Sequence, residues 1–79
     1  MPAGDNSHRL TKSMISQSRV IAKGRAIREI ERLVTAYGGT PSQWIKKSSP
    51  VVTIGNKAAE LHWYECHGVG RVEVKVKQV

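Results

Sequence analysis

Cysteine, acidic residues and long apolar runs are scarce in this sequence, and each scarcity excludes a class of protein. Only one of the 79 residues is a cysteine, Cys66, so no disulfide can form within the chain. No apolar run approaches the roughly 18 residues that a membrane-spanning helix needs. Residues 1–17 contain no apolar stretch typical of a signal peptide. The sequence therefore predicts a globular domain of a reducing compartment, with no membrane span.

The familiar motifs of catalysis and cofactor binding are also missing. There is no G-x-S-x-G motif for acyl transfer, no P-loop, no H-E-x-x-H zinc motif and no metal-spaced pair of carboxylates. The three histidines are scattered along the chain, so we expect neither a metal site nor a cofactor. The length allows one domain and excludes a Rossmann fold, a barrel or a two-domain enzyme.

Positive charge is what the chain has in excess. Lys and Arg number 13 against 6 Asp and Glu, which gives a formal charge of +7. The excess lies in residues 1–49, which hold nine basic and three acidic residues. A charge of this sign favours polyanions such as nucleic acid.

The N-terminal half of the sequence predicts an arm and one helix. Residues 1–17 are polar and predict a flexible basic arm, with a short helix from Leu10 to Ser16. Residues 18–37 carry a one-sided apolar stripe at helical spacing, which predicts a helix that the pair Gly38-Gly39 ends. Gly24 weakens this helix and marks either a close packing contact or a break between two helices. Arg25, Arg28 and Arg32 would share another face of this helix, where Arg25 could pair with Glu29.

The C-terminal half predicts a connector and three strands. Residues 38–50 would form a loop with one helical turn after Pro41, in which Thr40 caps the turn and Trp44 reaches the core. The period then changes to two, which predicts the strands Val51–Ile54, Ala58–Cys66 and Arg71–Val79. The expected fold is α+β: one or two N-terminal helices packed on a three- to four-stranded antiparallel β-meander, as a single domain over residues 18–79.

Alternation along the last two strands predicts which side chains share a face. Leu61 and Trp63 would join the three valines 72, 74 and 76 against the helix. A two-residue turn at Gly68-Val69 preserves this match. It places three pairs on the outer face, namely Tyr64 opposite Glu73, His62 opposite Lys75 and Glu60 opposite Lys77.

The outer-face cluster is the candidate catalytic site. Metal-free RNA cleavage needs a general base for the 2′-OH, an acid for the 5′-oxygen and cations for the phosphorane charge. Glu60 or His62 could act as base and His62 as acid, while Lys75 supplies charge and Tyr64 an aromatic surface. The basic side chains expected to contact RNA are Arg9, Lys12, Arg25, Arg28, Arg32, Lys46, Lys47, Arg71 and Lys77.

Three stretches of the sequence resemble a known group of proteins. They are N-x-H-R-L-x-K-S-M-I (Asn6 to Ile15), Y-G-G-T-P-x-x-W (Tyr37 to Trp44), and L-H-W-Y-E with R-V-E-V-K-V-K (Leu61–Glu65, Arg71–Lys77). They resemble C-terminal toxin domains of bacterial polymorphic and contact-dependent inhibition toxins, many of which belong to the Barnase/EndoU/colicin/RelE group of small ribonucleases. No catalytic residue is carried over, because that group shares an architecture rather than a fixed motif.

The resemblance implies a biological setting and partners. Such domains are delivered at the end of a long secreted protein and act in the cytoplasm of a target bacterium. The expected substrate is tRNA or another structured RNA, and the expected inhibitor is an acidic cognate immunity protein. Two other functions fit the same basic surface: a nucleic-acid-binding domain without catalysis, and a protein-interaction domain that meets an acidic partner.

Overall fold

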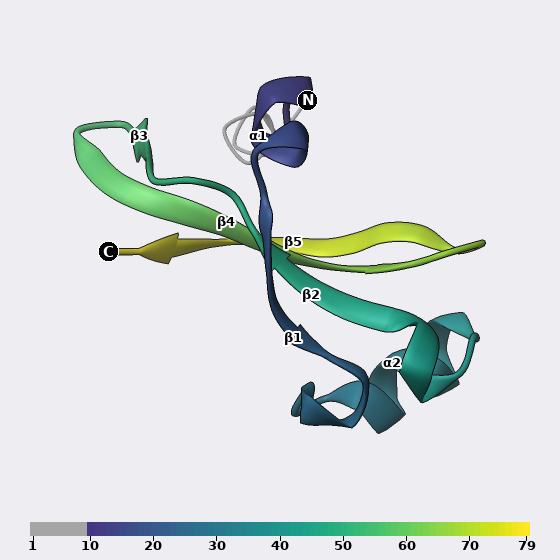
Figure 1. Ribbon diagram of the computed structural model, residues 1–79. Coiled ribbons are helices and arrows are strands. Elements are labelled where there is room, and N and C mark those ends of the chain that lie inside the picture. The colour runs from purple at the N-terminus through teal and green to yellow at the C-terminus, as the bar shows by residue number, and fades with distance from the viewer. Residues whose placement is uncertain (1–9) are drawn as a thin grey trace, which may run out of the picture.

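The computed structural model describes residues 10–79, which form an α+β domain with a five-stranded antiparallel sheet (Figure 1). The elements in chain order are α1 (Lys12–Ser16), β1 (Arg19–Lys23), the 3-10 turn η2 (Gly24–Ala26), α2 (Ile30–Tyr37), the 3-10 turn η3 (Pro41–Gln43), β2 (Trp44–Ser48), β3 (Val52–Ile54), β4 (Lys57–Cys66) and β5 (Gly70–Gln78). The α+β class and the antiparallel meander are confirmed, although two of the five strands were not expected.

Strand β4 is the centre of the sheet. It pairs with β2 and β3 along one side and with β5 along the other, while β1 pairs with the far side of β2. Figure 1 shows β1 connecting α1 at one end of the molecule to η2 and α2 at the other end. The hairpin predicted at Gly55-Asn56 is confirmed, since β3 ends at Ile54 and β4 begins at Lys57.

The helix predicted over residues 18–37 is wrong in its first half. Residues 19–23 form β1, and Gly24 then turns the backbone with a φ of 58°. Val20 and Ile21 are β-branched and favour a strand once β2 offers its backbone as a partner. The second half is helical, and the predicted end is confirmed, because Gly38 follows Tyr37 with a φ of 97°.

The connector predicted over residues 38–50 contains strand β2. The helical turn after Pro41 is present, and the Gln43 side chain accepts a hydrogen bond from the backbone N–H of Thr40 at 3.0 Å. Trp44 then begins β2, which lies between β1 and β4. Lysines and serines interrupt any apolar alternation in this strand, which is why its sequence resembles a loop.

The pairing of β4 with β5 follows the predicted register only beyond a β-bulge. Glu60 lies opposite Lys77 and His62 opposite Lys75, as predicted, but Tyr64 lies opposite Val72 rather than Glu73. A three-residue turn replaces the expected two-residue turn, and the bulge absorbs the extra residue. Glu73 sits at this bulge with a φ of 58°, a conformation that is rare for residues other than glycine.

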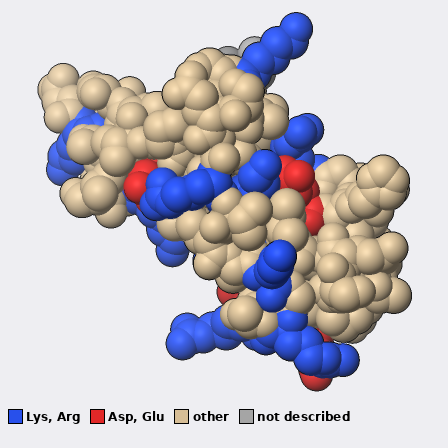
Figure 2. Space-filling view, viewed as in Figure 1, with Lys and Arg blue, Asp and Glu red and all other residues tan. Residues whose placement is uncertain are grey.

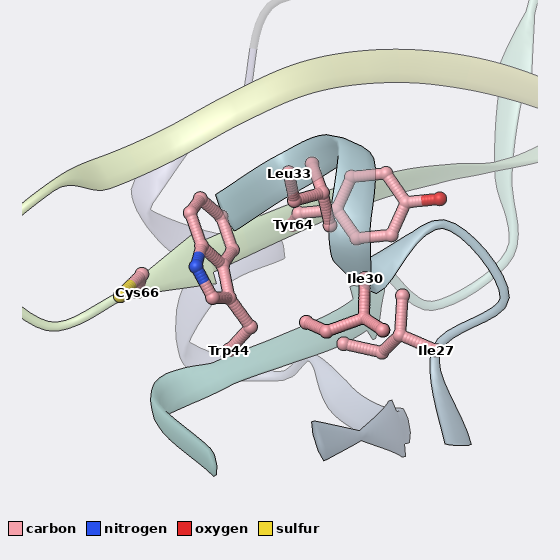
Figure 3. Packing of buried hydrophobic residues seen from close by; sticks show 6 residues of the cluster. All are labelled: Ile27, Ile30, Leu33, Trp44, Tyr64 and Cys66. Carbon is pink, nitrogen blue, oxygen red and sulfur yellow. The ribbon is translucent and has the colours of Figure 1, made fainter. Parts of the chain in front are cut away.

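The bulge and strand β2 together change which face of β4 packs on α2. The helix covers Tyr64 and Cys66, and not Leu61 and Trp63 as predicted. Val72 joins this cluster because the bulge turns it to the face opposite the one that Val76 shares with Leu61. Figure 3 shows the cluster, which comprises Ile27, Ile30, Leu33, Trp44, Tyr64 and Cys66. Leu61 and Trp63 are nevertheless fully buried, on the other face of the sheet.

Candidate functional site

The carboxylate of Glu60 lies at the centre of a polar cluster contributed by three strands. Its Oε1 is 3.0 Å from Nε2 of His62 and 3.2 Å from Oγ of Ser48, and its Oε2 is 3.3 Å from Nη2 of Arg19. Arg19 pairs with Ser48 across β1 and β2, and Ser48 pairs with His62 across β2 and β4. Directly opposed residues share a face of a sheet, so the three donors converge on Glu60.

These contacts lower the pKa of Glu60. The hydrogen bond from His62 is the largest cause, and hydrogen bonds from Arg19 and Ser48 act in the same direction against the cost of burial. Each donor stabilises the carboxylate more than the protonated acid. Glu60 is therefore ionised at neutral pH, and the same hydrogen bonds make it a weaker base than a free carboxylate.

His62 is largely buried beside this carboxylate. Its side chain is 18% exposed, and its Nδ1 atom is buried without a hydrogen-bond partner among the described residues. A carboxylate only accepts hydrogen bonds, so Nε2 of His62 carries the proton in the contact with Glu60. The Nε2 proton is therefore the one that His62 can deliver.

Lysines surround the Glu60–His62 pair. Lys75 and Lys77 are exposed and lie opposite His62 and Glu60 on β5. Lys46 of β2 places its Nζ 5.6 Å from the centre of the Tyr64 ring. A small pocket of about 60 Å³ is lined by His62, by these three lysines and by Glu29, Trp63, Tyr64 and Glu73. It is far smaller than the roughly 300–1,000 Å³ typical of small-molecule sites.

Tyr64 does not have the exposed position predicted for it. Its side chain is 6% exposed and packs in the hydrophobic cluster under α2, because the helix covers this part of β4 (Figure 3). Burial raises the pKa of its hydroxyl. We therefore give Tyr64 no base-stacking role.

The other basic side chains fall into three groups. Arg32 and Arg71 are paired with acidic side chains: Arg32 contacts Glu29 and Glu73, and Arg71 contacts Glu65 at 3.4 Å. The pair predicted between Arg25 and Glu29 is absent, because Arg25 lies in η2 and α2 begins only at Ile30, so the two residues do not share a helix. The second group is Lys47 alone, which pairs with Trp63 and so lies on the face of the sheet away from His62.

The third group is exposed and scattered. Arg25 and Arg28 both precede α2, so the helix face that they were predicted to share with Arg32 does not exist. Lys12 lies on α1. Arg9 lies outside the described residues. Figure 2 shows basic side chains spread over one view of the molecule, with acidic side chains beside several of them.

Sequence reasoning missed two members of the cluster, Arg19 and Ser48. Both lie on strands that the hydropathy pattern did not reveal, and their approach to Glu60 depends on long-range pairing. By contrast, Glu60, His62, Lys75 and Lys77 came from alternation within one hairpin, and their pairing is as predicted. Their predicted place on an outer face away from the helix is wrong, because Glu60 and His62 share the face of β4 on which α2 covers Tyr64 and Cys66, and both are largely buried.

Comparisons of the chain with protein-family models, curated proteins and solved structures find no match. Within residues 10–79, no helix is long and apolar enough to cross a membrane. The same residues contain no group of three or more His, Cys, Asp and Glu side chains placed to hold a metal ion. The site's own geometry therefore has to carry any functional assignment.

Proposed function

We propose that this protein is a metal-independent ribonuclease that cleaves tRNA or another structured RNA. The observation that carries the proposal is the 3.0 Å contact between Glu60 and His62, with the cations of Arg19, Lys75 and Lys77 around it. A carboxylate beside an imidazole supplies both proton transfers that the reaction needs. The cations supply charge where the phosphorane forms.

Each step of the reaction has a candidate group. Glu60 takes the proton of the 2′-OH, and the 2′-oxygen attacks the adjacent phosphorus. The bond from phosphorus to the 5′-oxygen breaks, and His62 in its protonated form gives the Nε2 proton to that oxygen. The products are a 2′,3′-cyclic phosphate and a free 5′-OH. Bound RNA has to separate the Glu60 carboxylate from the His62 imidazole, while hydrogen bonds from Arg19 and Ser48 hold the carboxylate in place.

The small size and the charge of the site favour a polymeric substrate. The pocket beside His62 cannot enclose a metabolite, but exposed lysines beside it can bind successive phosphates. The formal charge of +7 acts in the same direction. We include in the proposal the setting that the sequence resemblance implies: delivery within a larger secreted toxin, action in the target-cell cytoplasm and inhibition by an acidic immunity protein.

One observation favours a second candidate, a nucleic-acid-binding domain without catalysis. Both nitrogens of His62 are occupied or buried, and both oxygens of Glu60 have partners. A pair held in this way could serve only to join β1, β2 and β4. The two candidates differ in whether RNA is cut.

Incubation of the purified protein with total tRNA in EDTA tests the proposal. The ribonuclease produces fragments that end in 2′,3′-cyclic phosphate, and His62→Ala stops their formation while the fold is retained. His67→Ala is the matched control, because His67 lies exposed in the β4–β5 turn. If wild-type protein binds tRNA in a salt-dependent way but leaves it intact, the non-catalytic candidate replaces the ribonuclease.

A further inference from the structure

A second and much larger hollow lies beside the start of α2. Its volume is about 660 Å³, and residues 25 and 27–32 line it. Ile27 and Ile30 also line it, but each is almost completely buried and leaves little apolar surface for a ligand. Arg25 and Arg28 are exposed at its sides. The volume falls within the roughly 300–1,000 Å³ of ligand-binding pockets.

Some of the charged side chains that line the hollow form ion pairs, and others do not. Arg32 is tied to Glu29 and Glu73, and the hydrogen bond from Arg32 lowers the pKa of Glu29. Arg25 and Arg28 form no ion pair within residues 10–79. Glu31 is the remaining acid at this hollow. The two unpaired guanidinium groups are therefore the ones free to bind an anion.

The hollow adjoins the candidate catalytic site at Glu29. This residue lines both the large hollow and the small pocket that holds His62, Lys75 and Lys77. The small pocket has room for the reacting phosphate group, and only the large hollow has room for a nucleoside beside it.

We propose that this hollow is a subsite for a nucleotide of single-stranded RNA next to the cleaved bond. Arg25 and Arg28 bind the phosphates on either side of that nucleotide. Single-stranded RNA offers closely spaced phosphates on a flexible backbone, which two unpaired guanidinium groups can bind together. The subsite rests on the proposed ribonuclease function, since it locates the RNA of that reaction.

Binding of an uncleavable RNA tests the subsite separately from catalysis. The probe is a short, fluorescently labelled 2′-O-methyl oligoribonucleotide, in which no 2′-OH can attack. The double variant Arg25→Ala/Arg28→Ala should bind it roughly tenfold or more weakly, and the slope of log K against log salt should fall by about 1.4, or about 0.7 for each lost phosphate contact. The double variant Lys23→Ala/Lys57→Ala loses the same charge outside the hollow and is the control.

The outcomes separate the subsite from the reaction. Equal losses in the two double variants would overturn the subsite, even if wild-type protein cleaves RNA. A loss confined to the Arg25/Arg28 variant would support it, even if wild-type protein cleaves nothing and the ribonuclease proposal fails.

Discussion

Arg32 of α2 donates a hydrogen bond to each carboxylate oxygen of Glu73 on β5, both at 2.8 Å. Tyr37 donates a further hydrogen bond to the same carboxylate at 2.8 Å. Glu73 is the residue at the β-bulge that has a φ of 58°. Side chains of α2 therefore contact β5 at the β-bulge, where the pairing register between β4 and β5 changes.

The strained backbone of Glu73 should reverse the usual order of stability in a strand, in which an alanine variant is more stable than a glycine variant. Glu73→Ala loses the ion pair and keeps an unfavourable φ, whereas Glu73→Gly loses the ion pair but adopts that φ without a penalty. We expect the glycine variant to be more stable than the alanine variant by about 1 kcal/mol. Urea unfolding measures the difference. An alanine variant that is the more stable of the two would show that the bulge has a different conformation.

The carboxylate of Glu73 also gives stability a specific pH dependence. Hydrogen bonds from Arg32 are the main cause that lowers its pKa from 4.5 to about 2. The folded pKa is below the unfolded one, so this stabilisation is complete above pH 4.5 and is lost as the pH falls towards 2. The free energy of unfolding, measured from pH 6 downwards, should fall less steeply in Glu73→Gln than in wild type. Parallel curves for the two proteins would rule out the depressed pKa.

Two adjacent glycines give a matched test of packing beneath α2. A Cβ at Gly39 would lie 2.8 Å from Sγ of Cys66 and 3.2 Å from Nε1 of Trp44, whereas a Cβ at Gly38 would meet nothing within 4 Å. Both residues have positive φ, so both alanine variants carry backbone strain. Gly39→Ala should therefore unfold at a clearly lower temperature than Gly38→Ala, by an overpacking cost of about 1–3 kcal/mol. Equal melting temperatures would place Trp44 and Cys66 farther from this loop.

Arg19 is expected to matter for cleavage although its side chain is mostly exposed. It contacts Glu60 through one nitrogen and retains other N–H donors for a phosphate. Arg19→Gln should slow RNA cleavage by about 10²-fold, the effect of removing one transition-state donor. Arg71→Gln removes an arginine that pairs with Glu65 instead, and it is the control. Similar rates for the two variants would remove Arg19 from the site.

The parts of the fold that could be predicted depend on neighbours in sequence. The β4–β5 hairpin followed from alternation, and the helix end at Tyr37 followed from Gly38. The strand β1 could not be recognised, because its residues extend a helical pattern unless β2 pairs with them. The bulge at Glu73 was equally invisible, since it accompanies a three-residue β4–β5 turn where alternation predicts two residues, and it is contacted by Arg32 from a distant part of the chain.

The same distinction separates the residues of the candidate site that could be predicted from those that could not. Glu60, His62, Lys75 and Lys77 were predicted together because two adjacent strands place them. Arg19 lies 41 positions from Glu60 in the sequence, so no local pattern could join them. Tyr64 was misplaced because its environment depends on a helix whose position on the sheet the sequence left open.

In the proposed ribonuclease, Glu60 and His62 act as one catalytic unit. The most direct test is the initial rate of RNA cleavage in EDTA for wild type, Glu60→Gln, His62→Gln and the double variant. Residues that act together are strongly non-additive, so we expect each single variant to lose about 10²-fold or more and the double variant to be little slower than either. Cleavage at the wild-type rate in either single variant, or no cleavage by the wild-type protein, would contradict the account.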